Sequence, residues 1–207
     1  CNRRGIPVLR SRKNTDEVIS RVILQLAEEF SPETIAHGTT VDCYGVGVLI
    51  VGAPGIGKSE VALELVERGH RLVADDVVAL KRRREDSLYA ESSPVIEHHM
   101  EIRGVGIIDI KSVYGVGHVR NSKRIGLVVE LEDWNQTTMY DRTGLTDEHV
   151  TILGVRVPYL LIPVRPGRNI AIIIEVAALN HRLKELGVHP AQQLNAKLMS
   201  MMSETDG

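Results

Sequence analysis

Aromatic residues are scarce in this sequence: they make up 3% of its 207 residues, with a single Phe and a single Trp. A core with so few rings has to be built from Val, Ile, Leu and Ala, which favours buried strands covered by helices. The shortage also argues against a platform of aromatic rings that would stack on single-stranded nucleic acid. A formal net charge of −2 offers no bulk attraction to a polyanion, so we expect no nucleic acid partner.

Long apolar runs and cysteine pairs are lacking as well. No run of about 18 apolar residues occurs, so we expect neither a membrane span nor a signal peptide. The two cysteines are Cys1, at the very first position, and Cys43. This arrangement argues against a structural disulfide and favours a reducing, cytoplasmic location. Because the first residue is not Met, we expect the chain to begin partway through a longer protein.

The residues that are present are typical of a globular domain, with 43% hydrophobic and 25% charged residues. Helical spacing of apolar residues predicts helices at 16–30, 58–68, 170–186 and 191–202, whereas short strand-like runs predict strands at 39–43, 45–51, 71–74 and 125–131. Thr15 is the expected N-cap of the first helix. Strands and helices intermingle, so the predicted class is α/β, with a central, mostly buried sheet flanked by helices.

One short segment contains a complete phosphate-binding loop. It has the spacing G-x-x-x-x-G-K-[ST] and consists of Gly52, Ala53, Pro54, Gly55, Ile56, Gly57, Lys58 and Ser59. The glycines let the backbone turn its N–H groups towards phosphate oxygens, and the helix that follows directs its positive end to the same place. We expect Lys58 to reach the β- and γ-phosphates and Ser59 to offer its hydroxyl to Mg²⁺. The segment follows an apolar strand and opens an amphipathic helix, as this motif requires.

Two adjacent carboxylates, Asp75 and Asp76, come directly after the strand predicted at 71–74. Two carboxylates cannot both be buried there without partners. We interpret them as a functional pair in which one supports Mg²⁺ and the other handles a proton, with a solvated turn as the alternative. Glu60, beside Ser59, is either a further acid on the metal side or a solvated helix residue.

Other charged residues are grouped in pairs. Glu101 and Arg103 flank Ile102, so on a strand they share one face, either within a site or as a surface ion pair. Arg165 and Arg168 lie in a segment rich in Pro and Gly, where they are either solvated or form an anion site. The phosphate-binding loop alone is also compatible with a nucleotide-hydrolysing switch or a non-catalytic nucleotide sensor. No N-K-x-D motif of a switch occurs, and the adjacent acids and arginines favour chemistry over sensing.

Taken together, these segments resemble the HPr kinase/phosphorylase family. The resemblance runs from about Ile6 to the C-terminus and rests on residues 37–38, 44–49, 55–60, 68–76, 100–109, 141–142 and 163–169. Its most specific part is the pattern E-I-R-G-x-G-I-I-D at residues 101–109. It implies an enzyme that uses ATP or pyrophosphate to phosphorylate a serine of HPr, the small carrier protein of the sugar phosphotransferase system. The same enzyme would remove the phosphoryl group with inorganic phosphate, giving pyrophosphate.

The resemblance also implies roles for individual residues. Lys58 would bind phosphate, Ser59 would be a Mg²⁺ ligand, and Glu101 would be a carboxylate on the metal side. Asp75 and Asp76 would lie near the reacting hydroxyl, with Asp76 favoured as the general base. Two further catalytic positions are His37 and Arg142. A segment needed mainly for dephosphorylation would comprise Pro163, Val164, Arg165, Pro166, Gly167 and Arg168.

The resemblance also implies a domain organisation and an oligomeric state. Residues 1–30 would be a connector and helix, and residues 31–207 the catalytic domain, with a kinase core similar to that of phosphoenolpyruvate carboxykinase. Family members carry an additional N-terminal domain and form hexamers, so we expect a homo-hexamer. The reaction would serve carbon catabolite control in the bacterial cytoplasm.

Overall fold

The computed structural model describes residues 10–83, 86–93, 95–135, 140 and 147–205, and the chain divides into two units between Pro32 and Glu33. The first unit contains helix α1 (Thr15–Glu29), close to its predicted bounds. The predicted N-cap is wrong by one residue, because Asn14 Oδ1 accepts a 2.9 Å hydrogen bond from the backbone N–H of Glu17. Thr15 is already inside the helix, and a capping side chain has to precede the first helical residue.

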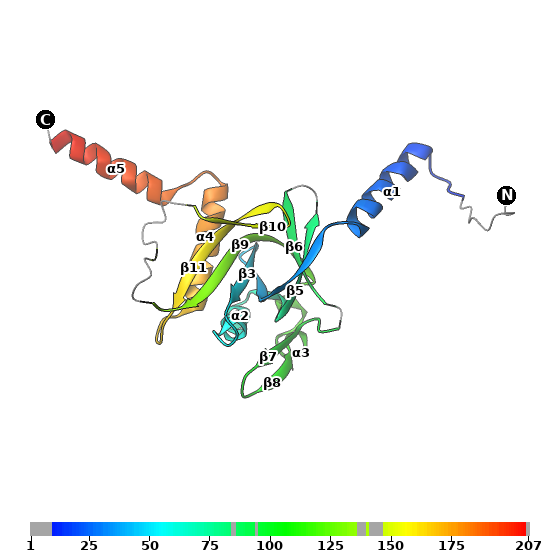
Figure 1. Cartoon of the computed structure of the whole chain (residues 1–207), viewed down its shortest axis with the longest axis horizontal. Coiled ribbons are helices and arrows are strands. Elements are labelled where there is room, and N and C mark those ends of the chain that lie inside the picture. Colours follow the sequence, from blue (N-terminus) through cyan, green and yellow to red (C-terminus); the bar gives the residue numbers. More distant parts are fainter. Residues whose placement is uncertain (1–9, 84–85, 94, 136–139, 141–146, 206–207) are drawn as a thin grey trace. The chain divides into compact units, whose positions relative to one another are not determined.

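The second unit is built on one large mixed sheet (Figure 1). Nine strands of the described residues join it, and seven of them follow the order β1-β5-β6-β9-β3-β2-β4. The remaining two extend it, since β11 pairs with β9 and β10 pairs with β11. The strands are β1 (Glu33–His37), β2 (Thr39–Cys43), β3 (Val46–Gly52), β4 (Arg71–Ala74), β5 (Val77–Arg83), β6 (Ser87–Ser92), β9 (Ser122–Asp133), β10 (His149–Ile152) and β11 (Val155–Val164).

The strand directions bring several loops to one edge of this sheet. Strands β3, β9 and β11 run parallel, so their carboxyl ends lie at the same edge. Strand β2 lies between β3 and β4 and is antiparallel to both. The carboxyl end of β4 therefore reaches the same edge, beside the amino end of β2. The phosphate-binding loop and the two aspartates follow β3 and β4, and so they meet there.

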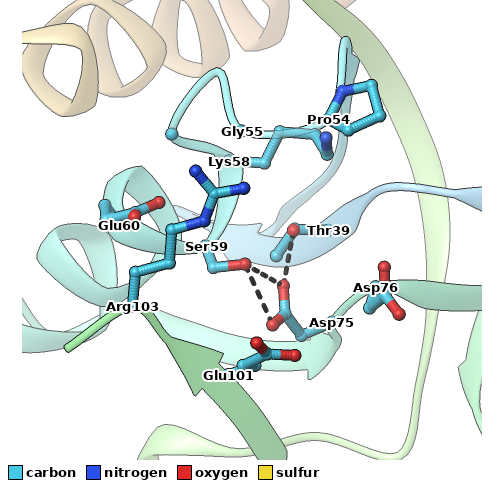
Figure 2. A pocket seen from close by; sticks show the side chains of 11 residues that line it. Thr39, Pro54, Gly55, Lys58, Ser59, Glu60, Asp75, Asp76, Glu101 and Arg103 are labelled. Atoms are coloured by element: carbon cyan, nitrogen blue, oxygen red, sulfur yellow. Dashed lines mark hydrogen bonds between the residues drawn. The ribbon is translucent and has the colours of Figure 1, made fainter. Parts of the chain in front are cut away.

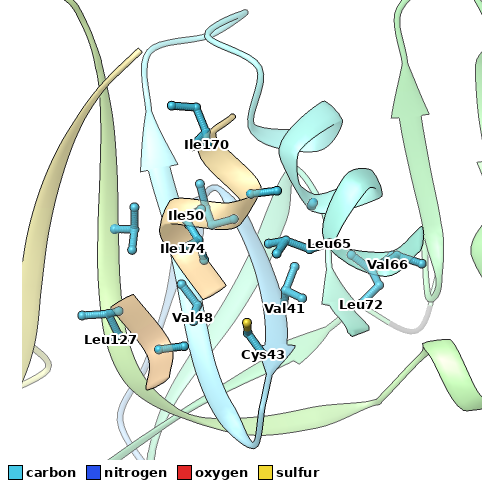
Figure 3. Close-up of a cluster of buried hydrophobic side chains, with 14 of the residues drawn as sticks. Val41, Cys43, Val48, Ile50, Leu65, Val66, Leu72, Leu127, Ile170 and Ile174 are labelled. Carbon is cyan, nitrogen blue, oxygen red and sulfur yellow. The ribbon is translucent and has the colours of Figure 1, made fainter. Parts of the chain in front are cut away.

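Two helices, α2 (Lys58–Glu67) and α4 (Ile170–Glu185), pack on one face of the sheet. Figure 3 shows Leu65 of α2 and Ile174 of α4 against Val48 and Ile50 of β3. The neighbouring residue Leu49 points to the other face and belongs to a second cluster with side chains of β4, β5, β6, β9 and β11. The fully buried side chains of both clusters are aliphatic or sulfur-containing, as the shortage of aromatics predicts, and the predicted α/β class is confirmed.

The remaining elements lie between β6 and β9 or after β11. A two-stranded hairpin is formed by β7 (His99–Ile102) and β8 (Gly106–Asp109). It is followed by the short helix α3 (Ile110–Tyr114) and by a single 3-10 turn, η1 (Val116–His118). Helix α5 (Pro190–Thr205) comes last. Of these elements, the hairpin contributes side chains to the site described next.

Candidate active site

The phosphate-binding loop joins the carboxyl end of β3 to the amino end of α2, as predicted from the sequence. Gly55 and Gly57 have φ angles of +81° and +101°, a left-handed conformation that glycine adopts without strain. Lys58 Nζ donates hydrogen bonds to the carbonyl oxygens of Gly52 at 3.0 Å and Ala53 at 3.1 Å. The ammonium group therefore lies within the loop, where the N-terminal end of α2 adds its own partial positive charge.

A pocket of about 190 Å³ opens beside the loop (Figure 2). Its walls come from the loop, from the amino end of β2, from the carboxyl end of β4 and from the β7–β8 hairpin. The lining residues are Thr39, Pro54, Gly55, Gly57, Lys58, Ser59, Glu60, Asp75, Asp76, Glu101 and Arg103. Cationic and anionic side chains face the same small space, which suits a phosphate group together with a metal ion.

The two adjacent aspartates of this pocket have different surroundings. Asp75 is only 5% exposed, and Ser59 Oγ lies 3.0 Å from each of its carboxylate oxygens. Thr39 Oγ1 donates a second hydrogen bond to Asp75 Oδ1 at 2.6 Å. Burial raises the pKa of the Asp75 carboxyl above its usual value, and the hydrogen bonds from Thr39 and Ser59 act against this rise. Asp76, in contrast, is exposed at the wall of the pocket.

A tight backbone turn separates the two side chains. The N–H of Val77 donates to the carbonyl oxygen of Asp75 at 2.7 Å, and Asp76 between them has a φ of +60°. These features define a γ-turn, which is strained for a residue other than glycine. The N–H of Gly38 holds the turn in place by donating to the carbonyl oxygen of Asp76 at 3.1 Å. The carboxylates of Asp75 and Asp76 therefore point in different directions (Figure 2).

Glu101 and Arg103 both reach the pocket from the β7–β8 hairpin, Glu101 from β7 and Arg103 from the turn that follows it, whereas the sequence placed both on one strand. The guanidinium group of Arg103 lies against the loop at Gly55, because a Cβ atom at Gly55 would be only 3.0 Å from both of its terminal nitrogens. Glu101 lies on the Asp75 side of the pocket (Figure 2). The hairpin thus adds one carboxylate near the aspartates and one cation near the loop.

Other residues predicted for the site lie around this pocket or outside the described chain. His37 ends β1 opposite Val77 of β5, so it is close to the Asp76 turn, but it does not line the pocket. Ala53 and Ile56 line a second pocket, beside the carboxyl end of β9. Arg142 lies outside the described residues.

The segment 163–168, to which the resemblance assigns dephosphorylation, begins within a strand. Strand β11 continues to Val164, and Pro163 pairs in register with Glu132 of β9. Strand β10 flanks only residues 155–158 of β11. Among the described residues, β11 therefore has a partner on a single side at Pro163, and a residue without an N–H is tolerated there.

The two arginines that follow β11 are held by their own neighbours. The guanidinium group of Arg165 stacks on the ring of Trp134, at 4.1 Å from its centroid. Arg168 donates a 3.0 Å hydrogen bond to the carbonyl oxygen of Pro163. Both follow a strand parallel to β3 and so lie at the same edge of the sheet as the phosphate-binding loop, although neither lines its pocket.

Sequence reasoning missed Thr39 entirely. Its hydrogen-bond partner Asp75 lies 36 residues further along the chain, and nothing local to Thr39 indicates this contact. Arg103 was recognised only as the companion of Glu101, and its alternation with Glu101 was the available signal. Both residues line the pocket.

Comparison with known proteins assigns the family. The model of the HPr serine kinase C-terminal domain matches residues 28–198 of the chain. The chain belongs to the HPr serine kinase C-terminal domain family. The HPr kinase/phosphorylase of Thermoanaerobacter pseudethanolicus is 53% identical over 195 residues, which are 94% of this chain and 64% of that protein. The protein of the same name from Geobacillus kaustophilus is 52% identical over 202 residues, 98% of this chain and 65% of the relative.

A solved structure of the same kind supports the HPr kinase fold. The HPr(Ser) kinase/phosphatase from Coxiella burnetii matches with a TM-score of 0.69 and 36% identity, over 74% of this chain and 93% of that chain. This chain spans slightly less than two thirds of the length of its curated HPr kinase/phosphorylase relatives. Within the described residues, no helix is long and apolar enough to cross a membrane.

Proposed function

We propose that this chain is a Mg²⁺-dependent serine kinase and phosphorylase that acts on the protein HPr. ATP or pyrophosphate would donate the phosphoryl group, and inorganic phosphate would remove it again as pyrophosphate. The names of the HPr kinase/phosphorylase relatives support this proposal. The observation that carries it is the contrast between two neighbouring carboxylates, with Asp75 buried against Ser59 and Asp76 exposed in the same pocket.

The residues around Ser59 fit a Mg²⁺ ion. The Ser59 hydroxyl uses its single proton in a hydrogen bond to the Asp75 carboxylate. The lone pairs of Ser59 Oγ therefore remain available to a cation. Glu101 would supply a further hard oxygen ligand at the same side of the pocket. Mg²⁺ is usually held by one or two protein oxygens together with phosphates and water, and there it would neutralise charge on the phosphates.

Positive charge for the transferred phosphoryl group would come from the loop and the hairpin. Phosphoryl transfer depends mainly on positioning and on electrostatic stabilisation of the equatorial oxygens. Lys58 places its ammonium group within the loop, and Arg103 approaches the same loop at Gly55. Both cations would therefore contact phosphate oxygens, while the N–H groups of the loop bind the remaining ones.

Asp76 would be the general base. In the kinase direction it would accept the proton of the seryl hydroxyl of HPr while that oxygen attacks the γ-phosphorus and ADP leaves. In the reverse direction inorganic phosphate would attack the phosphorus of the phosphoserine, and Asp76 would return the proton to the departing seryl oxygen. One group suffices for both directions because phosphorolysis is the reverse of phosphorylation by pyrophosphate, in which inorganic phosphate leaves instead of ADP and the proton follows the same path. His37, which lies beside the Asp76 turn, would assist at the entrance for the serine.

We further propose roles for three arginines. Arg165 and Arg168 follow β11 at the edge of the sheet that carries the phosphate-binding loop, and they would guide inorganic phosphate in the reverse reaction. Arg142 would add a further charge to the transition state. We also propose a homo-hexamer in the bacterial cytoplasm, in keeping with the family resemblance.

The proposal is tested by mixing the chain with Mg²⁺, ATP and purified HPr and measuring the mass of HPr. HPr should gain one phosphoryl group, and adding inorganic phosphate should remove it and release pyrophosphate. Consumption of ATP without a change in the mass of HPr would indicate a nucleotide-hydrolysing switch instead. Binding of ATP without any turnover would indicate a nucleotide sensor.

Two variants separate the roles of the aspartates. Asp76→Asn should lower the rates in both directions by about a hundredfold or more, because the base is lost, while MgATP still binds. Asp75→Asn should instead weaken the effect of Mg²⁺ on nucleotide binding. If Asp76→Asn kept either reaction at its normal rate, the base would have to be another group.

A further inference from the structure

The amino end of β2 occupies a special position in this sheet. Strand β2 lies between β3 and β4, with Thr39 opposite Ile50 of β3 and Thr40 opposite Ala74 of β4. Because β2 is antiparallel to both neighbours, its first residue lies beside the two strand ends that carry the phosphate-binding loop and the aspartates. Thr39 is that first residue, and it is fully buried.

Thr39 and Ser59 act on the same carboxylate from two different elements. Thr39 Oγ1 donates to Asp75 Oδ1 at 2.6 Å, and Ser59 Oγ lies 3.0 Å from both Oδ1 and Oδ2 (Figure 2). Hydrogen bonds from the backbone of Glu101 and of Asp76 also reach this carboxylate. Besides Ser59, Thr39 is the side-chain donor to it, so Thr39 helps to fix the plane of the Asp75 carboxylate, and this plane decides where the proton of Ser59 points.

We propose that Thr39 is a positioning residue for the Mg²⁺ site. By fixing Asp75, it keeps the Ser59 hydroxyl hydrogen-bonded to the carboxylate. The lone pairs of Ser59 Oγ then point into the pocket, where a cation between Ser59 and the phosphates would bind. The inference rests on the Mg²⁺–nucleotide part of the proposed function and does not depend on HPr as substrate. Thr39 itself does not need to touch the metal or the nucleotide.

The neighbouring threonine supplies a matched control. Thr40 is also fully buried in β2, and within the described residues its hydroxyl has no hydrogen-bond partner. Replacing either threonine by valine exchanges one hydroxyl for a methyl group of similar size at adjacent buried positions. Only Thr39→Val removes a hydrogen bond to Asp75, so the two variants separate the positioning effect from a general disturbance of β2.

The test measures how strongly Mg²⁺ tightens nucleotide binding. Isothermal titration calorimetry of the whole chain with the non-hydrolysable imido analogue of ATP gives one Kd in excess Mg²⁺ and another in EDTA. Thr39→Val should raise the Kd in Mg²⁺ by about ten- to a hundredfold, the usual effect of removing a residue that orients a metal ligand. The Kd in EDTA should stay the same. Thr39→Ser, which keeps the hydroxyl, should behave like the unaltered chain, and Thr40→Val should change neither value.

Equal weakening of both Kd values by Thr39→Val would overturn the inference, because it would indicate a purely structural role. The same would follow if Thr40→Val reproduced the loss in Mg²⁺ or if Thr39→Ser failed to restore binding. Circular dichroism checks folding, and Thr39→Ala replaces Thr39→Val if the valine variant does not fold. The mass of HPr incubated with the unaltered chain is read separately. A chain that leaves HPr unmodified but keeps the Thr39-dependent effect of Mg²⁺ would refute the kinase proposal alone.

Discussion

Replacing Gly55 by alanine should disturb the site in a way that can be calculated from the structure. The new Cβ atom would lie 3.0 Å from both terminal nitrogens of Arg103 and 3.4 Å from its Cζ, so the guanidinium group has to shift by a few tenths of an ångström. Gly55 also has a φ of +81°, and a side chain in this left-handed conformation costs about 1–2 kcal/mol of folding free energy. We expect both a loss of stability and a weaker hold on phosphate.

Gly69→Ala separates these two effects. Gly69 follows α2 with a φ of +98°, and no described atom lies within 4 Å of the Cβ that alanine would add. This control should lose about 1–2 kcal/mol of stability, as Gly55→Ala does, without any change in the pocket. Only Gly55→Ala should weaken MgATP binding, by roughly tenfold if one charge-assisted contact with phosphate is lost. Urea unfolding and titration calorimetry measure the two quantities.

A double-mutant cycle decides whether the loss acts through Arg103. In an Arg103→Ala background the guanidinium group is already absent, so adding Gly55→Ala should cost little further affinity for MgATP. If the tenfold loss persists in that background, the contact between Arg103 and the loop is irrelevant. The argument from the 3.0 Å approach would then be refuted.

Three further predictions concern Glu175 and Cys43, which both contact His70 just beyond the carboxyl end of α2. Hydrogen bonds from Arg68 lower the pKa of the Glu175 carboxyl below its ordinary value of 4.5, so the charged group stabilises the fold above about pH 4.5. Glu175→Gln should therefore lower the urea midpoint near neutral pH, and the difference from the unaltered chain should shrink as the pH falls below 4.5. Burial raises the pKa of the Cys43 thiol from 9.0 to about 12, so the stability that it contributes should be complete below pH 9 and decrease as the pH rises towards 12. In a Cys1→Ser variant, a thiol reagent at about pH 8 should react with Cys43 only after unfolding; rapid reaction of the folded chain would contradict this.

The parts of the site that could be predicted depend on residues that are close together in the sequence. The phosphate-binding loop needs a strand, a fixed spacing of glycines and a helix, and all three are local in the sequence. The alternation of side chains on a strand placed Glu101 and Arg103 together, although Arg103 reaches the pocket from the turn after β7. The aspartates could be placed at a strand end because the apolar run 71–74 stops directly before them. Local patterns therefore predicted most of the residues that line the pocket.

Contacts between distant segments could not be predicted in this way. Sequence patterns place Thr39 on a strand but do not say that β2 lies between β3 and β4, and the hydrogen bond to Asp75 depends on that order. Similarly, His70 Nε2 lies 2.9 Å from Glu175, more than a hundred residues away along the chain. Likewise, the segment rich in Pro and Gly that contains Arg165 and Arg168 begins inside β11, because Pro163 pairs with β9 on the side of β11 that β10 does not cover.

Two identical residues side by side can have different functions only if the backbone gives them different environments. Without the turn at Asp76, the chain would continue in the direction of β4, and the alternation of side chains along a strand would direct the two carboxylates to opposite faces of the sheet. The γ-turn changes this: it leaves Asp75 buried between two hydroxyls and exposes Asp76 to the pocket. Such a turn costs about 1–3 kcal/mol at a residue with a side chain, and glycine would avoid most of that cost. A carboxylate at the strained position makes sense if its chemistry is needed there, and the hydrogen bond from Gly38 together with the pairing of β1 and β5 offsets the strain.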